Sequence, residues 1–183
     1  ELEEFSADKV TLVAPVRNEM VFLPSFLHHY RALGIEQFCF IDDHSDDGSA
    51  EFIDRQKDCV LVRSRHRFGQ RLWLRPDITG LMHWGQRAGA AWKNWFPRRY
   101  LPRRWCVYAD LDEYLLLPPE YETLQEFFKS LDARAITAVP AVMVDFYPPT
   151  IRELARPLDA GITELNCEIT VTNYGDSLLN ALN

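Results

Sequence analysis

Residues 11–49, TLVAPVRNEMVFLPSFLHHYRALGIEQFCFIDDHSDDGS, decide the fold. The stretch opens with a β-rich apolar run that ends at Val16 and leads into the polar loop Arg17-Asn18-Glu19, which is typical of a buried strand and its exit. Apolar residues then recur at helical spacing over 23–33, and Gly34 suits the end of that helix. This segment therefore predicts a strand followed by a helix.

The same order repeats directly afterwards. An apolar run over 37–41 enters the acidic, turn-forming loop 42–49, and a short helix over 50–56 precedes a third strand at 59–63. Strands that alternate with helices through short connections favour a parallel sheet. We therefore expect an α/β, Rossmann-like fold whose mostly parallel sheet is flanked by helices on both faces.

Further elements extend this pattern toward the C-terminus. Residues 64–76 show no clear period and predict a basic loop, and the next apolar face predicts a long helix from about residue 81 that Pro97 ends. The elements predicted after that helix are a strand at 105–109, a helix at 123–131 and a strand at 135–144.

Length and composition indicate one ordinary domain. The chain has 183 residues, of which 47% are hydrophobic, and this is enough to bury a substantial core. It contains no long apolar run and no N-terminal signal peptide. Because it begins with Glu1, we expect it to be a fragment, and membrane association through segments outside this sequence stays open.

The four cysteines are widely spaced and form no C-x-x-C pair. This spacing favours buried thiols over a zinc site or a disulfide framework, and hence a reducing, cytoplasmic location. The net charge is −7, but residues 63–104 hold eleven Lys and Arg side chains against Asp77 alone. The acidic remainder argues against nucleic acid as a partner, whereas the basic segment is either a solvated face or a surface for a phosphorylated or acidic ligand.

Two acidic motifs follow predicted strands. Asp43 lies just after the second strand, and Asp110 and Asp112 follow the strand at 105–109. In doubly wound sheets ligands bind beyond the carboxyl ends of the strands, so we expect these carboxylates to gather at one edge. Asp110 and Asp112, two residues apart at a strand end, are expected to project to the same side and to bind Mn²⁺ or Mg²⁺, which prefer carboxylate oxygens.

Two stretches carry a family resemblance: APVRNEMVFLPSFLHHYRALGIEQFCFIDDHSDDGS at 14–49 and WCVYADLDEYLLLP at 105–118. Together they resemble glycosyltransferase family 2 proteins of the GT-A fold, in the subgroup whose metal motif reads D-x-D-E-[FY]. The resemblance implies a single GT-A-like domain over 1–183, with a nucleotide-sugar-binding part at 1–118 and an incomplete or divergent acceptor-side part at 119–183.

The resemblance also implies roles for individual residues. Asp43 would contact the base, Asp110 the ribose or metal, and Asp112 the metal and diphosphate. The backbone of five further residues would line the nucleotide pocket: Pro15, Val16, Arg17, Asn18 and Glu19. The implied reaction is metal-dependent transfer of a sugar, normally with inversion, from a UDP- or GDP-sugar to a glycan, lipid or protein acceptor.

A catalytic base is less clearly indicated. Asp145, in VDFYPP beyond a predicted strand, is the candidate, with a turn or capping role as the alternative. Two other functions stay open. A phosphohydrolase of the haloacid dehalogenase type would use Asp110 as nucleophile and Asp112 as acid/base, although Tyr114 departs from its usual motif; a non-catalytic nucleotide-binding module would lack acceptor machinery.

Overall fold

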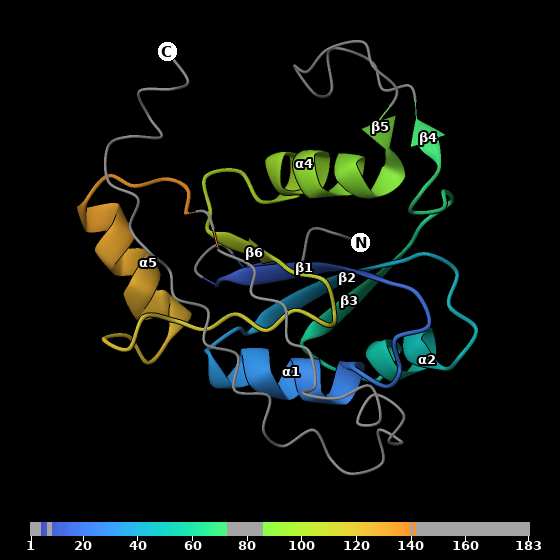
Figure 1. The fold of residues 1–183 in the computed structure, drawn as a ribbon, viewed down its shortest axis with the longest axis horizontal. Helices are drawn as coiled ribbons and strands as arrows, with labels where there is room; N and C mark the ends of the chain where they lie inside the picture. Colours follow the sequence, from blue (N-terminus) through green and yellow to red (C-terminus); the bar gives the residue numbers. More distant parts are fainter. Residues whose placement is uncertain (1–4, 7–8, 73–85, 140, 142–183) are drawn as a thin grey trace, which may run out of the picture. The chain divides into compact units, whose positions relative to one another are not determined.

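The computed structural model describes residues 5–6, 9–72, 86–139 and 141, and the chain divides into two compact units, Glu1–Tyr114 and Leu115–Asn183. The first unit contains a four-stranded parallel sheet in the order β3-β2-β1-β6 (Figure 1). Its strands are β1 (Thr11–Val16), β2 (Gln37–Asp42), β3 (Cys59–Arg63) and β6 (Cys106–Tyr108). The predicted Rossmann-like α/β architecture is confirmed.

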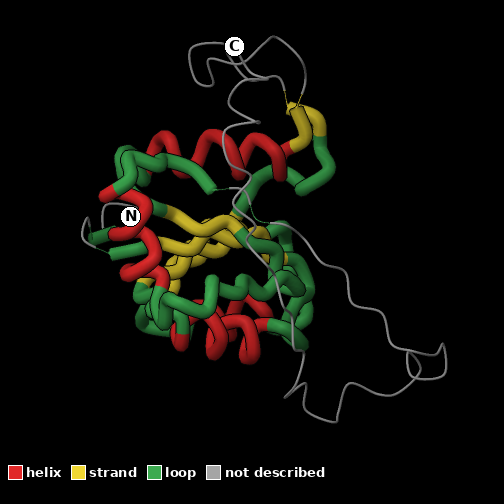
Figure 2. Tube along the Cα trace, turned by 60° about the vertical axis from the view of Figure 1, so that its left-hand side comes forward, coloured by secondary structure: helices red, strands yellow, loops and turns green. Residues whose placement is uncertain are grey.

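Helices cover both faces of this sheet. Helices α1 (Leu23–Ala32) and α2 (Ser49–Asp54) lie on one face, and α4 (Ala88–Tyr100) lies on the other (Figures 1 and 2). Side chains alternate along β2 accordingly. The Phe40 ring lies 6.2 Å from that of Phe26 on α1, whereas Cys39 and Ile41 pack in the same cluster as Trp92 of α4. This alternation follows from the two-residue period of a strand.

Helix α1 forms where the sequence predicted it. Pro24 stands in its first turn, where the missing amide hydrogen costs no internal bond, and Gly34, with φ of 87°, takes the left-handed conformation after its end. The buried side chains Phe26, Leu27 and Tyr30 lie on its sheet-facing stripe. The helix is therefore held by packing on the sheet as well as by its own hydrogen bonds.

The connection before α4 differs from the prediction. Arg71–Leu72 form a short strand, β4, that pairs antiparallel with β5, Gln86–Arg87. The predicted basic loop is therefore wrong at its end, and α4 begins at Ala88 rather than near residue 81. Gln86 and Arg87 are paired with β4 in a two-stranded sheet. This pairing, rather than the helical spacing of apolar residues, decides their conformation. Residues 73–85 lie outside the described residues.

Pro97 does not end α4, which continues to Tyr100. The side chains on either side of it are anchored in the core: Phe96 and Leu101 are each 3% exposed. The Leu101 amide donates to the Pro97 carbonyl at 2.8 Å. Packing of these two side chains therefore outweighs the hydrogen bond that a proline cannot donate.

In the second unit, α5 (Leu124–Ala133) confirms the helix predicted at 123–131. Thr123 and Glu126 form a reciprocal capping box at its start. The strand predicted at 135–144 is absent over 135–139 and at 141, and residues 142–144 are not described. The amides of Ala135 and Ile136 instead donate back to carbonyls of the last helical turn, and Ala135 has φ of 54°.

Cysteine burial agrees in part with the prediction. Cys39 is buried, and burial raises the pKa of its thiol to about 12. Cys59 and Cys106 are half-buried and free, and Cys167 lies outside the described residues. Among the helices that the structure describes, none combines the length and the apolar character needed to cross a membrane.

Truncating the core contact between α1 and the sheet tests this packing. Phe26→Ala removes a fully buried ring, so we expect a loss of about 3–5 kcal/mol in the free energy of unfolding, measured by urea denaturation. Val21→Ala, at a side chain that is 54% exposed, is the control and should change that free energy by less than about 0.5 kcal/mol. Equal effects of the two variants would contradict the described core.

Candidate functional site

The strand order reverses beside β1. The chain runs outward from β1 through β2 to β3 and then crosses back, so that β6 pairs with the free side of β1, with Leu12 opposite Val107. In sheets of this kind ligands bind beyond the carboxyl ends of the strands at such a reversal. The loops that follow β1, β2 and β6 are therefore the place to look for a site.

The first two of these loops are joined by hydrogen bonds. The Asn18 side chain donates to Asp46 Oδ1 at 2.7 Å and accepts from the Asp46 amide at 2.8 Å. The Glu19 amide donates to Ser49 Oγ at 3.0 Å, and Ser49 Oγ in turn donates to Asp47. Asp46 and Asp47, in the loop predicted to form a turn, therefore fix the position of Asn18 and Glu19.

Asp43 is a buried carboxylate that directly follows β2. It is 3% exposed, and its amide donates to the Val16 carbonyl at 2.8 Å. Its Oδ2 accepts from the Phe68 amide at 2.9 Å and lies 3.5 Å from an Arg17 nitrogen, while Arg67 lies 3.8 Å from Oδ1. Oδ1 has no hydrogen-bond partner within the described part of the chain. Two half-exposed guanidinium groups therefore balance its charge.

The D-x-D motif lies on a turn rather than on a continued strand. Strand β6 ends at Tyr108, and the Glu113 amide donates to the Asp110 carbonyl at 3.0 Å. The Glu113 carboxylate folds back and accepts from the Asp110 amide, also at 3.0 Å. The motif therefore follows β6 on a turn, so the strand geometry from which Asp110 and Asp112 were expected to project to the same side does not extend to them. The turn ties Glu113 to the backbone that carries both aspartates.

The residue after this turn is anchored on α1. The Tyr114 hydroxyl lies 2.8 Å from Ser25 Oγ, and the Tyr114 ring meets the edge of His29 at 5.2 Å between centroids. The Tyr30 hydroxyl donates to the Glu113 carbonyl at 3.1 Å. Both residues that follow the second aspartate, Glu113 and Tyr114, thus hold the turn against the helix. Sequence reasoning did not assign these roles.

The electrostatics show that carboxylates from three loops share one region. Partial burial raises the pKa of Glu19, and the negative charges of Asp112, Asp47 and Asp110 raise it further, in that order. These four carboxylates come from the exits of β1, β2 and β6. Glu19 therefore lies within electrostatic range of Asp110 and Asp112, whereas the predicted gathering of Asp43 with these two aspartates stays a prediction.

The pKa of the Asp110 carboxyl group is also raised. Burial raises its pKa most, the charge of Asp112 raises it further, and the ammonium group of Lys93 acts in the opposite direction. Lys93 Nζ also lies 5.0 Å from the centroid of the Tyr108 ring, within the range of a cation–π contact. Lys93 was missed at the level of sequence, where its only signal is its place in the basic segment.

The remaining predicted residues divide into two groups. Pro15 and Val16 lie on β1 and lead into the loop described above, whereas Asp145 lies outside the described residues. Across the described ranges, no three His, Cys, Asp or Glu side chains are already arranged to hold a metal ion.

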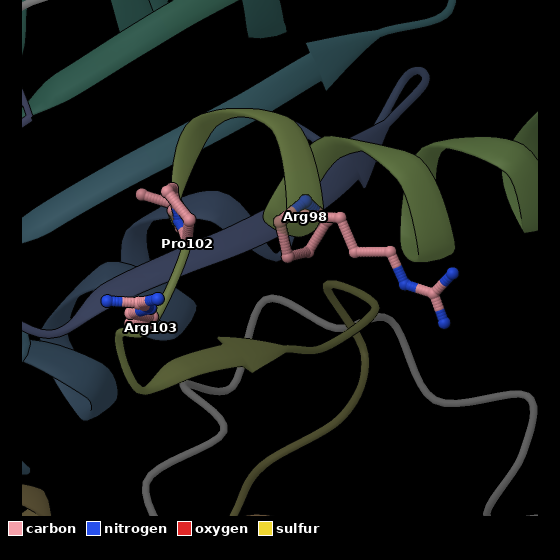
Figure 3. Close-up of a pocket in the computed structure, with 5 residues that line it drawn as sticks. Arg98, Pro102 and Arg103 are labelled. Carbon is pink, nitrogen blue, oxygen red and sulfur yellow. The ribbon is translucent and has the colours of Figure 1, made fainter. Parts of the chain in front are cut away.

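A separate pocket of about 350 Å³ lies at the C-terminal end of α4. Pro97, Arg98, Leu101, Pro102 and Arg103 line it. Figure 3 shows that the guanidinium group of Arg98 extends away from Pro102 and Arg103, so the two arginines do not converge on a common point. This pocket therefore lacks the converging charges of an anion site.

The fold and these loops define a Rossmann-like α/β domain with carboxylates gathered at the reversal of the sheet. Over 130 residues, 70% of this chain, it is 22% identical to a glycosyltransferase family 92 protein of Oryza sativa subsp. japonica. Over 101 residues, 55% of this chain, it is 26% identical to one of Ricinus communis. These matches cover 19% and 15% of the relatives, so the chain spans less than a fifth of their length. No family model and no solved structure matches the chain.

Neutralising Asp110 tests the crowding of carboxylates. A raised pKa in the folded state means that protonated Asp110 stabilises the fold, and that this contribution is lost as the pH rises through the folded-state pKa. Asp110→Asn should therefore raise the free energy of unfolding at pH 7 relative to wild type. The gain should shrink toward an ordinary aspartate's pKa of 3.8, as measured by urea denaturation across this range.

A matched control is available on α2. Asp54→Asn removes an exposed carboxylate that pairs with the exposed Arg63 side chain at 2.9 Å, so it should lower the free energy of unfolding by at most about 1 kcal/mol. If Asp110→Asn also lowers it at pH 7, the crowding of charge around Asp110 is disproved.

Proposed function

We propose that this chain is the nucleotide-binding part of a metal-dependent glycosyltransferase that takes its sugar from a UDP- or GDP-sugar. The observation that carries the proposal is the position of Glu19, Asp110 and Asp112 in the loops after β1 and β6, near enough that the charges of the two aspartates raise the pKa of Glu19. Its similarity to two glycosyltransferase family 92 proteins supports the reaction class, and the resemblance of its motifs to family 2 enzymes supports the GT-A type of fold and an inverting reaction.

The carboxylates suit a divalent cation. Burial and mutual repulsion raise the pKa of both Glu19 and Asp110, and a cation beside them would offset that repulsion. Their oxygens are the ligands that Mn²⁺ and Mg²⁺ prefer, with phosphate oxygens of the substrate completing the coordination. Asp110 and Asp112 would hold the ion. When bound, it would neutralise the charge that develops on the departing nucleoside diphosphate.

Other residues of the chain would position the nucleotide. Asp43 is buried yet keeps an oxygen free of hydrogen bonds in the described structure, which fits the base contact that the resemblance implies. Arg17 lies 3.5 Å from Asp43, and the positive charge of Lys93 acts on Asp110. Both would attract a diphosphate toward the acidic turn. The acceptor, whether glycan, lipid or protein, would bind through parts of the whole protein, where Asp145 is the proposed base.

Calorimetric titration with UDP, GDP and their sugars, with and without Mn²⁺, tests the proposal. Wild type should bind at least one diphosphate in a Mn²⁺-dependent way, and Asp112→Ala should weaken that binding at least tenfold because it removes a metal ligand. Asp54→Ala, an exposed aspartate on α2, is the matched control and should bind as wild type does.

Three outcomes would overturn this function. Hydrolysis of a simple aryl phosphate without any diphosphate binding would favour a phosphohydrolase. Binding that is equal with and without Mn²⁺, and equal in Asp112→Ala, would remove the metal role of the motif. Mn²⁺-dependent binding with no sugar transfer or hydrolysis by the whole protein would indicate a non-catalytic module.

A further inference from the structure

Phe68 is an aromatic side chain that the fold holds in place yet leaves open to solvent. It is 44% exposed, and it is one of two large hydrophobic residues exposed among the residues described, the other being Val21. It belongs to the loop between β3 and β4, whose course Figure 1 shows, and its carbonyl is hydrogen-bonded at the start of α4.

Hydrogen bonds fix the backbone of Phe68 from two directions. Its amide donates to the buried Oδ2 of Asp43 at 2.9 Å. Its carbonyl accepts from the Gly89 amide at 3.0 Å, in the first turn of α4. The Ala88 amide, next to it, donates to the Gln70 carbonyl at 2.8 Å. The loop is therefore tied both to the exit of β2 and to a helix on the other side of the sheet.

The inner edge of the Phe68 ring is fixed as well. It meets the Trp92 ring at a centroid distance of 6.0 Å and an angle of 64°, an edge-to-face arrangement. A Cβ atom at Gly89 would overlap the ring. Gly89 thus makes room for the aromatic side chain, because any side chain with a Cβ atom at this position would displace the ring.

The surroundings of the ring suit a flat, anionic ligand. Arg67, the preceding residue, donates to the Asp43 carbonyl at 3.1 Å, and Arg17 lies 3.5 Å from Asp43 Oδ2. Both side chains are about half exposed. An exposed ring next to guanidinium groups is the combination that binds bases by stacking and their phosphates by charge.

We infer that the Phe68 ring is the stacking surface for the nucleobase of the donor, and that Gly89 is present to seat it. This inference rests on the proposed function and adds a residue to its nucleotide site. The base would lie on the exposed face of the ring, beside the loop that Asp43 holds, while its diphosphate extends toward the acidic turn. Aromatic stacking tolerates any base, so Phe68 would contribute affinity rather than choice between uracil and guanine.

The test compares the binding affinity of a ligand that carries a nucleobase with that of a ligand that lacks one. Titrations in Mn²⁺ would use UDP, GDP and inorganic pyrophosphate as probes. Phe68→Ala should weaken binding of the tighter nucleotide about tenfold and leave pyrophosphate unchanged. Phe68→Leu keeps the hydrophobic bulk but should weaken nucleotide binding nearly as much, because it removes the aromatic ring. Phe68→Tyr keeps the ring and should bind the nucleotide as wild type does.

A second variant changes the ring's position without removing it. Gly89→Ala should displace the ring and weaken the nucleotide alone, with thermal unfolding showing that the domain still folds. Nucleotide binding that is unchanged in Phe68→Ala, or an equal loss of nucleotide and pyrophosphate, would overturn the inference while leaving the proposed function intact. Failure of wild type to bind either nucleotide would instead overturn the proposed function and the stacking role with it.

Discussion

The position of β1 between β2 and β6 is the constraint on which the rest of the structure depends. Parallel pairing on both sides aligns the carboxyl ends of these three strands, so the loops that leave them meet at one edge. Helix packing on both faces then buries β1: Leu12, Val13 and Ala14 are fully excluded from solvent. The polar residues that follow each strand therefore lie at this edge of the sheet.

The carboxylates in the loops at this edge repel one another, and the nearby Arg and Lys side chains offset this repulsion only in part. Asp43 is balanced by two arginines, and Lys93 acts on Asp110. Glu19 and Asp110 nevertheless keep a raised pKa. Crowding of like charges lowers stability without a ligand, and perturbed carboxylates in such a position are typical of functional sites. Glu113 and Tyr114 hold the turn that maintains this crowding, so these positioning residues bear directly on the site.

Much of the order of strands and helices could be predicted from local sequence patterns. The strand–helix–strand opening was predictable because each apolar run has the period of its element and each ends in residues that stop it, such as Gly34. That Asp43 and Asp110 follow strands of a parallel sheet was predictable because each comes after an apolar run of strand length. The start of α4 was not, since Gln86 and Arg87 are engaged by pairing with β4. The contacts of Lys93 and Phe68 likewise join distant segments and leave no period in the chain.

Paramagnetic broadening by Mn²⁺ in backbone amide spectra of the isotope-labelled chain, recorded with UDP or GDP present, tests the central claim most directly. The account predicts that signals from 110–113 and from Glu19 broaden first, because the ion is held where the exits of β1 and β6 meet. Signals from 98–101, at the far end of α4, should stay sharp. Broadening that spares 110–113, or that centres on another part of the chain, would contradict the account.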